Sequence, residues 1–173
     1  MKPTKLNKFK SLSKKKYLFL AFCGTLLCLI CFRILENKLG AQILDVLPRY
    51  NLNEVEKYFL IYGEEGRRLY AWASLSLDLL FPICYMALLI GLILLLTGSS
   101  IFRWLIILPI MLGVIDITEN IQICFMLVQY PEITDVQVNL ASSTTSFKHY
   151  ITNMTLVCII LLSIYKMITK LTK

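Results

Sequence analysis

Four long apolar stretches occupy most of this chain of 173 residues and restrict it to a membrane fold. Hydrophobic residues make up 57% of the sequence and the mean hydropathy is +0.68, outside the usual composition of a soluble domain. A bilayer core about 30 Å thick requires roughly 20 apolar residues for each crossing helix. The sequence therefore predicts an all-α, integral membrane four-helix bundle over residues 17–168, with spans at about 17–35, 73–96, 104–129 and 150–165.

The basic residues predict the orientation of this bundle. Seven lysines and no acid lie within the tail formed by residues 1–16. The positive-inside rule keeps that tail in the cytoplasm, together with Arg103 and the short tail 169–173. The connections 36–72 and 129–146 carry no basic excess. We therefore expect a multi-pass protein of the plasma membrane, of bacterial type, with both termini inside. The formal net charge of +7 reflects topology and does not indicate a nucleic-acid partner.

The first span and the cysteines each have a simple interpretation. The first span begins like a signal peptide, but no small-residue cleavage site follows it, which favours an uncleaved anchor. All six cysteines fall in predicted spans, where packing is their expected role. Cys28 and Cys31 do have the spacing of a redox pair in quinone-linked four-helix oxidoreductases. No second pair lies in an outer connection to pass electrons on, and we expect no cofactor.

The long connection 36–72 has a helical pattern of its own. Val55, Tyr58, Phe59 and Tyr62 recur at helical spacing, which predicts an amphipathic helix on the outer membrane surface that caps the bundle. Glycines at 63 and 66 interrupt this pattern before the chain enters the second span.

Three carboxylates lie within predicted spans, namely Asp78, Asp116 and Glu119. An ionisable group there costs about 2.5 to 3.5 kcal/mol on insertion scales and normally faces the bundle interior or a water-filled cavity. At 100° per residue, Asp116, Glu119 and Asn120 share one face of the third span. Amides and hydroxyls would join helices at lower desolvation cost, so three acids favour a binding site. A purely structural network remains the alternative.

The polar faces of the second, third and fourth spans converge in the outer half of the membrane. This arrangement predicts an outward-facing, carboxylate-lined pocket for a lipid-like or amphipathic small molecule, beneath the amphipathic segment. The candidate ligand-binding residues are Asp78, Asn120, Arg67, His149 and Asn153.

Asp116 and Glu119 form the candidate catalytic pair. Close carboxylates repel each other unless Arg67, Arg68 or Lys148 reaches them. A proton shared between the two would suit general acid/base chemistry or proton coupling. We expect no metal site, because the chain has one histidine and zinc usually takes more His or Cys ligands.

Two other functions stay open. A non-catalytic membrane interaction protein, such as an assembly factor or an immunity protein, would fit the small size and the missing nucleophile. Proton-coupled transport is third, because four helices seldom enclose a pathway without oligomerising. The expected partners are membrane lipid, a membrane protein or a second copy of the chain.

Two motifs support a family resemblance. The first runs from Tyr62 through Gly63, Glu65, Gly66, Arg67 and Tyr70 to Asp78 and Pro82, and the second contains Asp116, Glu119 and Asn120. They resemble the YGxEGRxxY…D…P and DxxEN segments of a group of uncharacterised bacterial four-helix membrane proteins. This resemblance covers the second to fourth spans and implies a four-helix fold without an activity. A fainter similarity, in architecture alone, is to the sterol-isomerase (EXPERA) fold, with four helices around a carboxylate-lined cavity.

Overall fold

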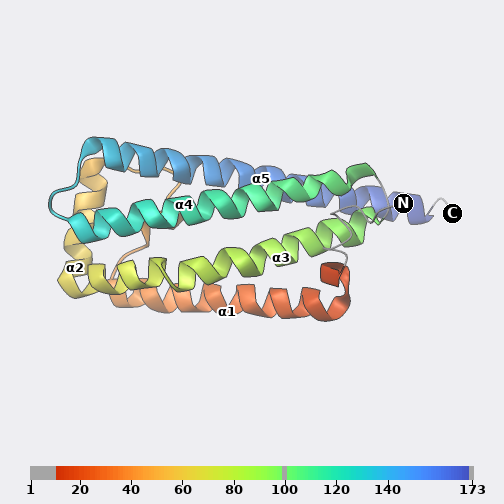
Figure 1. Ribbon diagram of the computed structural model, residues 1–173, viewed down its shortest axis with the longest axis horizontal. Helices are drawn as coiled ribbons and strands as arrows, with labels where there is room; N and C mark the ends of the chain where they lie inside the picture. Colours follow the sequence, from red (N-terminus) through yellow and green to blue (C-terminus); the bar gives the residue numbers. More distant parts are fainter. Residues whose placement is uncertain (1–10, 99–100, 172–173) are drawn as a thin grey trace, which may run out of the picture.

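Four long helices lie side by side in the computed structural model, which describes residues 11–98 and 101–171 (Figure 1). They are α1 (Lys15–Leu39), α3 (Leu77–Thr97), α4 (Ile107–Gln129) and α5 (Asp135–Leu171). Each belongs to a helical stretch that is long and apolar enough to cross a membrane, and the described residues contain no strand. The prediction of an all-helical fold with four long apolar helices is confirmed for the described residues. The lysines at 2, 5, 8, 10 and 173, on which part of the orientation rests, lie outside the described residues.

The helix α2 (Leu52–Ser74) lies across one end of the bundle, while α1 begins and α5 ends at the other (Figure 1). Asn51 begins α2 with a capping box, in which its side chain accepts from the Glu54 N–H and the Glu54 carboxylate accepts from the Asn51 N–H. Gly63 then breaks the helix with a φ of 65° and a ψ of −178°, a conformation essentially restricted to glycine. The predicted interruption at this glycine is confirmed, whereas Gly66, where a second interruption was predicted, lies within α2.

Two boundaries differ from the predicted spans. The helix α3 begins at Leu77 because the chain turns at Leu75 and Ser76 after leaving α2. The helix α5 begins at Asp135, so that most of the connection 129–146 is helical. Thr134 and Gln137 explain the early start, since each side chain bonds the backbone N–H of the other in a second capping box.

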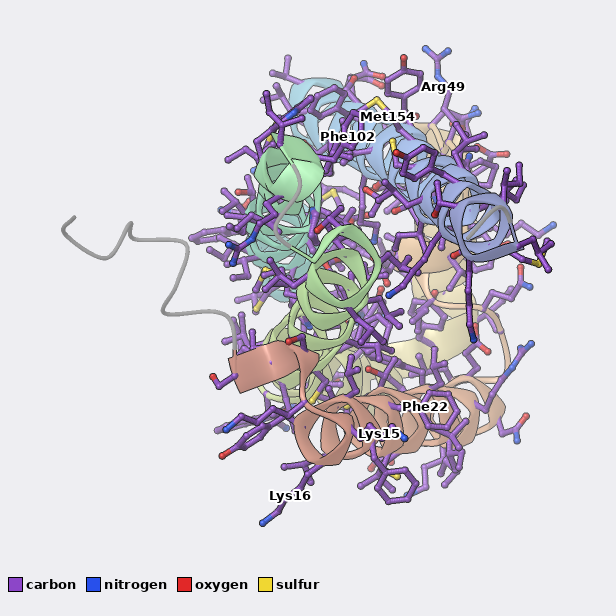
Figure 2. All side chains as sticks on the ribbon, turned by 90° about the vertical axis from the view of Figure 1, so that its right-hand side faces the viewer. Lys15, Lys16, Phe22, Arg49, Phe102 and Met154 are labelled. Carbon is purple, nitrogen blue, oxygen red and sulfur yellow. The ribbon has the colours of Figure 1, made fainter. Side chains whose placement is uncertain are left out.

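Apolar side chains cover the outside of the helices. Phe22 of α1, for example, is 53% exposed. Figure 2 shows it in a view along the helices, with the side chains drawn as sticks. Buried polar residues instead lie between the helices, including Asp78, Asp116 and Glu119. This distribution suits an apolar solvent around the bundle.

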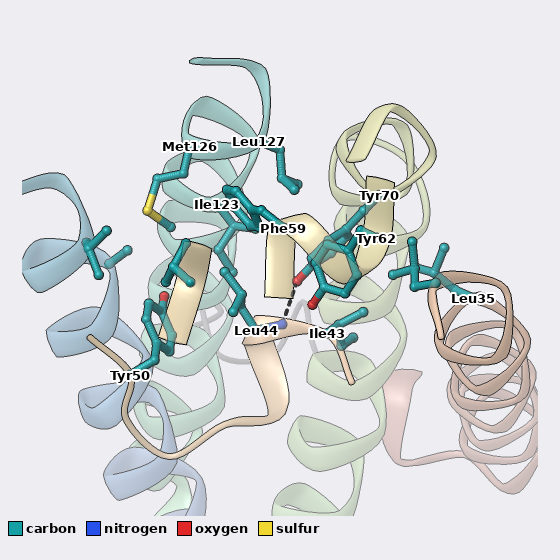
Figure 3. Close-up of a cluster of buried hydrophobic side chains, with 14 of the residues drawn as sticks. Leu35, Ile43, Leu44, Tyr50, Phe59, Tyr62, Tyr70, Ile123, Met126 and Leu127 are labelled. Atoms are coloured by element: carbon teal, nitrogen blue, oxygen red, sulfur yellow. Dashed lines mark hydrogen bonds between the residues drawn. The ribbon is translucent and has the colours of Figure 1, made fainter. Parts of the chain in front are cut away.

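The segment between α1 and α2, residues 40–51, folds into the end of the bundle and is called the cap segment here. It contains the short 3-10 helix η2 (Leu44–Val46), and Leu44 is fully buried. The Leu44 N–H donates to Tyr70 Oη at 3.1 Å (Figure 3). Tyr62 Oη donates to the Gln42 carbonyl at 2.5 Å. Around them lies a cluster of apolar side chains from α1, α2 and α4. These contacts hold the cap segment beneath α2.

Candidate functional site

Lys148 of α5 lies among three carboxylates at the capped end of the bundle. Its Nζ is 3.2 Å from Asp116 Oδ1 and 2.5 Å from Glu119 Oε2, both on α4. It also forms an ion pair with Asp45 of η2. The four side chains are at most 11% exposed. Asp45, Asp116, Glu119 and Lys148 are called the ion cluster below. Burial of this kind is tolerated because the charges are paired.

Hydroxyl groups hold the two α4 carboxylates in place. Tyr85 Oη donates to Asp116 Oδ2 at 2.9 Å, and Thr145 Oγ1 donates to Glu119 Oε1 at 2.5 Å. Tyr50 Oη of the cap segment lies 3.2 Å from Thr145 Oγ1. Burial raises the pKa of Tyr50 far above its ordinary value, so its phenol stays neutral and can act as the donor in this contact. A chain of hydrogen bonds therefore runs from the cap segment to Glu119.

Asp78 and Asn120 extend the polar region toward α3. Asn120 Nδ2 donates to the Asp78 backbone carbonyl at 2.7 Å, and each residue is 1% exposed. Asp78 Oδ1 and Asn120 Oδ1 have no hydrogen-bond partner among the described residues. Buried polar atoms normally have such partners, so each of these two oxygens is free to accept from a further donor.

The ion cluster contains three carboxylates and one ammonium, so it has more acidic than basic groups. Carboxylate oxygens of Asp45, Asp116 and Glu119 lie within 4.8 Å of one another, a donor set that hard cations favour. The Lys148 ammonium contacts all three, so a cation tethered to the chain stands where an ion would bind. Uncompensated negative charge in a low-dielectric interior is costly, and a further positive group nearby would relieve it.

A hollow of about 430 Å³ lies beside the ion cluster, between α1, η2 and α3. Its lining includes the apolar Phe32 and Phe81 and the acidic residues Glu36 and Asp45. Arg33 at its rim pairs with Glu36 at 2.9 Å, and the Arg33 side chain is 79% exposed. Asp45 therefore both lines the hollow and contacts Lys148. This volume is called the Asp45 hollow below.

The structure brings together four of the predicted site residues, namely Asp78, Asp116, Glu119 and Asn120. All four are at most 3% exposed, and the Lys148 ammonium contacts two of them, Asp116 and Glu119. Asp116 and Glu119 lie behind Asp45 and do not line the Asp45 hollow.

The other three predicted residues lie apart from the ion cluster. The Arg67 guanidinium donates to the Phe59 carbonyl at 2.8 Å, and Asn153 is exposed on α5. His149 lies beside the backbone of Leu47 in the cap segment, and its Nε2 has no hydrogen-bond partner among the described residues. The reason is the rotation of α5, whose buried face carries Ala141, Ser142, Thr145, Lys148, Ile151 and Thr155. The predicted face, through His149 and Asn153, is rotated away from it.

Sequence reasoning named Lys148 only as one of three cations and missed the roles of Asp45, Tyr50, Tyr85 and Thr145. A usable signal existed for α5, because small and hydroxyl residues recur there every three or four positions. No comparable signal marks Asp45, since its position depends on how the cap segment folds.

Comparison with known proteins offers no relative from which a function can be transferred. No family model matches the chain, and no match was found among curated proteins or solved structures. The resemblance of the two motifs to bacterial four-helix membrane proteins stays a prediction, as does the fainter similarity to the sterol-isomerase fold.

Proposed function

We propose that this protein spans the plasma membrane four times and binds an amphipathic molecule with a cationic head in the Asp45 hollow. In this topology the start of α1 and the end of α5 are cytoplasmic, and the cap segment lies outside. Basic residues at the bundle end opposite α2 support this orientation under the positive-inside rule. They are Lys14, Lys15, Lys16, Arg103, Lys166 and Lys170.

The observation that carries the proposal is that Asp45 lies between the hollow and Lys148. Asp45 lines the hollow, and its carboxylate shares the Lys148 ammonium with Asp116 and Glu119. A cationic head beside Asp45 and Glu36 would add the positive charge that the ion cluster lacks. At an effective dielectric constant of about 20, two unit charges about 4 Å apart attract by roughly 4 kcal/mol, enough to offset part of the desolvation cost.

The walls of the hollow suit an apolar chain that arrives from the bilayer. Phe32 and Phe81 pack edge to face with ring centroids 5.3 Å apart, and both line the hollow. Leu29 and Val46 at its edge are 47% and 45% exposed. A ligand can therefore enter from the lipid side while its head reaches Asp45, which fits the mostly apolar lining and few polar groups of ligand sites.

Binding of a fluorescent long-chain amine to the protein in phosphatidylcholine nanodiscs tests this function. We expect the amine to bind more tightly than a long-chain sulfate with the same fluorophore. Glu36→Gln removes a carboxylate from the wall without touching Lys148, and Val46→Phe fills part of the hollow. Both should weaken amine binding. Leu161→Phe, beside a separate hollow between α5 and η3 (Ile101–Ile106), is the matched control and should not.

Equal binding of amine and sulfate would refute the cationic head. Amine binding that is unaffected by Val46→Phe would refute the location. Helical circular dichroism of each variant shows whether it has folded.

Acid/base chemistry by Asp116 and Glu119 is the second candidate function, and one contact favours it. Lys148 joins Asp45 at the hollow to both carboxylates, so a ligand beside Asp45 can be linked to proton exchange within the ion cluster. Calorimetric titration of the amine in two buffers of different ionisation enthalpy measures such exchange. We expect a buffer-dependent heat that falls in Glu119→Gln. A heat independent of the buffer would refute the linkage and leave binding alone.

A further inference from the structure

A second hollow, of about 440 Å³, lies between the last part of α2 and the end of α4. Its lining includes Arg67, Arg68 and Trp72 from α2 and Leu127 and Tyr130 from the end of α4. It shares no lining residue with the Asp45 hollow. We call it the arginine hollow, and the function proposed above does not use it.

The guanidinium of Arg67 is held at the wall of the arginine hollow. Its Nη1 donates to the Phe59 carbonyl at 2.8 Å, and its central carbon lies 4.5 Å from the centroid of the Tyr130 ring. These two contacts fix the guanidinium in a cation–π arrangement. An arginine has five N–H donors, and the described residues accept from one Nη of this side chain. The other donors remain for a ligand.

Arg68 adds a second guanidinium to the same hollow. It is exposed and has no ion pair with any residue in the described ranges. Glu64 also lines the hollow, so that two cations face one carboxylate there. Paired guanidinium groups with a positive excess suit a phosphate group, whose oxygens accept several N–H bonds at once.

The rim of the arginine hollow suits a phosphate group that belongs to a lipid. Trp72 is 76% exposed and Val128 is 70% exposed, and both line the hollow. An exposed tryptophan beside arginines at the end of apolar helices is typical of the headgroup level of a membrane. Acyl chains can lie along Leu127 and Val128 while the headgroup reaches the arginines.

We propose that the arginine hollow is a binding site for the phosphate of an anionic phospholipid headgroup. Arg67 and Arg68 bind the phosphate oxygens and Trp72 packs against the glycerol and upper acyl region. The site gives the capped end of the bundle a lipid preference separate from any ligand in the Asp45 hollow.

Quenching of Trp72 fluorescence by brominated lipids tests the site in the full chain. The sequence contains two tryptophans, so the Trp104→Phe variant leaves Trp72 as the reporter. Brominated phosphatidylglycerol is titrated into phosphatidylcholine nanodiscs, and brominated phosphatidylcholine with the same acyl chains serves as the reference. We expect phosphatidylglycerol to quench at a severalfold lower mole fraction. Equal quenching by the two lipids would overturn the proposal.

Arg68→Gln is the main test variant, because Arg68 makes no bond that the fold requires. We expect it to weaken phosphatidylglycerol binding about fivefold, the factor that corresponds to about 1 kcal/mol per basic residue near an anionic surface. Arg49→Gln, at an exposed arginine of the cap segment outside the hollow, is the control and should leave the preference unchanged. A preference that survives Arg68→Gln would overturn the site.

Competition with 10 mM inorganic phosphate tests whether the arginine hollow binds the phosphate of a lipid headgroup or free phosphate. We expect it to leave quenching by phosphatidylglycerol unchanged, since it cannot contact the apolar rim. Displacement of the lipid by inorganic phosphate would overturn the assignment to a phospholipid.

Discussion

Replacing Lys148 by methionine removes the ammonium that Asp45, Asp116 and Glu119 share. Methionine keeps an unbranched side chain of similar length, so the packing of α5 changes little. Removal of one partner from a buried ion pair typically costs about 3 to 5 kcal/mol, because the remaining charges are left uncompensated. Lys148 is 8% exposed, so solvent screens this loss only weakly. We expect Lys148→Met to lower the free energy of unfolding by an amount in that range.

Reversible unfolding in mixed micelles with a rising fraction of sodium dodecyl sulfate measures this change. Far-ultraviolet circular dichroism follows the helices, and the free energy of unfolding is extrapolated to zero dodecyl sulfate. Lys57→Met is the matched control, because Lys57 is exposed on α2 and has no ion pair with a described residue. A surface change of this kind usually alters stability by no more than about 0.5 kcal/mol.

A triple variant separates lost charge pairing from lost packing. Combining Lys148→Met with Asp116→Asn and Glu119→Gln removes both α4 charges together with their partner. Because Asp45 is then the one carboxylate of the ion cluster left without its partner, we expect part of the lost stability to return. The reasoning fails if Lys148→Met unfolds like the Lys57→Met control. It also fails if the triple variant is less stable than Lys148→Met alone.

Three further changes are expected to lower the free energy of unfolding in the same assay. Tyr70→Phe leaves the fully buried Leu44 N–H without its acceptor and should cost about 1 to 3 kcal/mol. Gly63→Ala should cost about 1 to 3 kcal/mol through its backbone angles alone, since an added Cβ meets no atom within 4 Å. Gly113→Ala places a Cβ against the Met86 side chain and should cost about 1 to 3 kcal/mol. Gly113→Ala should lower the free energy of unfolding by less when Met86→Ala is already present. If the effects of the two substitutions simply add, the contact between them is refuted.

The sequence by itself determined the parts of this protein that depend on local physics. The thickness of a bilayer and the length of each apolar run were enough to predict four long helices, and the structure has them. The break at Gly63 was visible because glycine interrupts a helical pattern. Helical periodicity also placed Asp116, Glu119 and Asn120 on one face, and all three are buried.

Only the tertiary structure decided which groups meet those carboxylates. Asp45 and Lys148 are 103 positions apart, and their contact depends on how the cap segment folds beneath α2. Lys148 and His149 are adjacent in the sequence, yet a step of 100° around α5 directs Lys148 into the ion cluster and His149 toward Leu47. Periodicity within one helix shows which residues share a face. The partner of that face depends on the rotation and packing of every helix around it, which is a property of the whole fold.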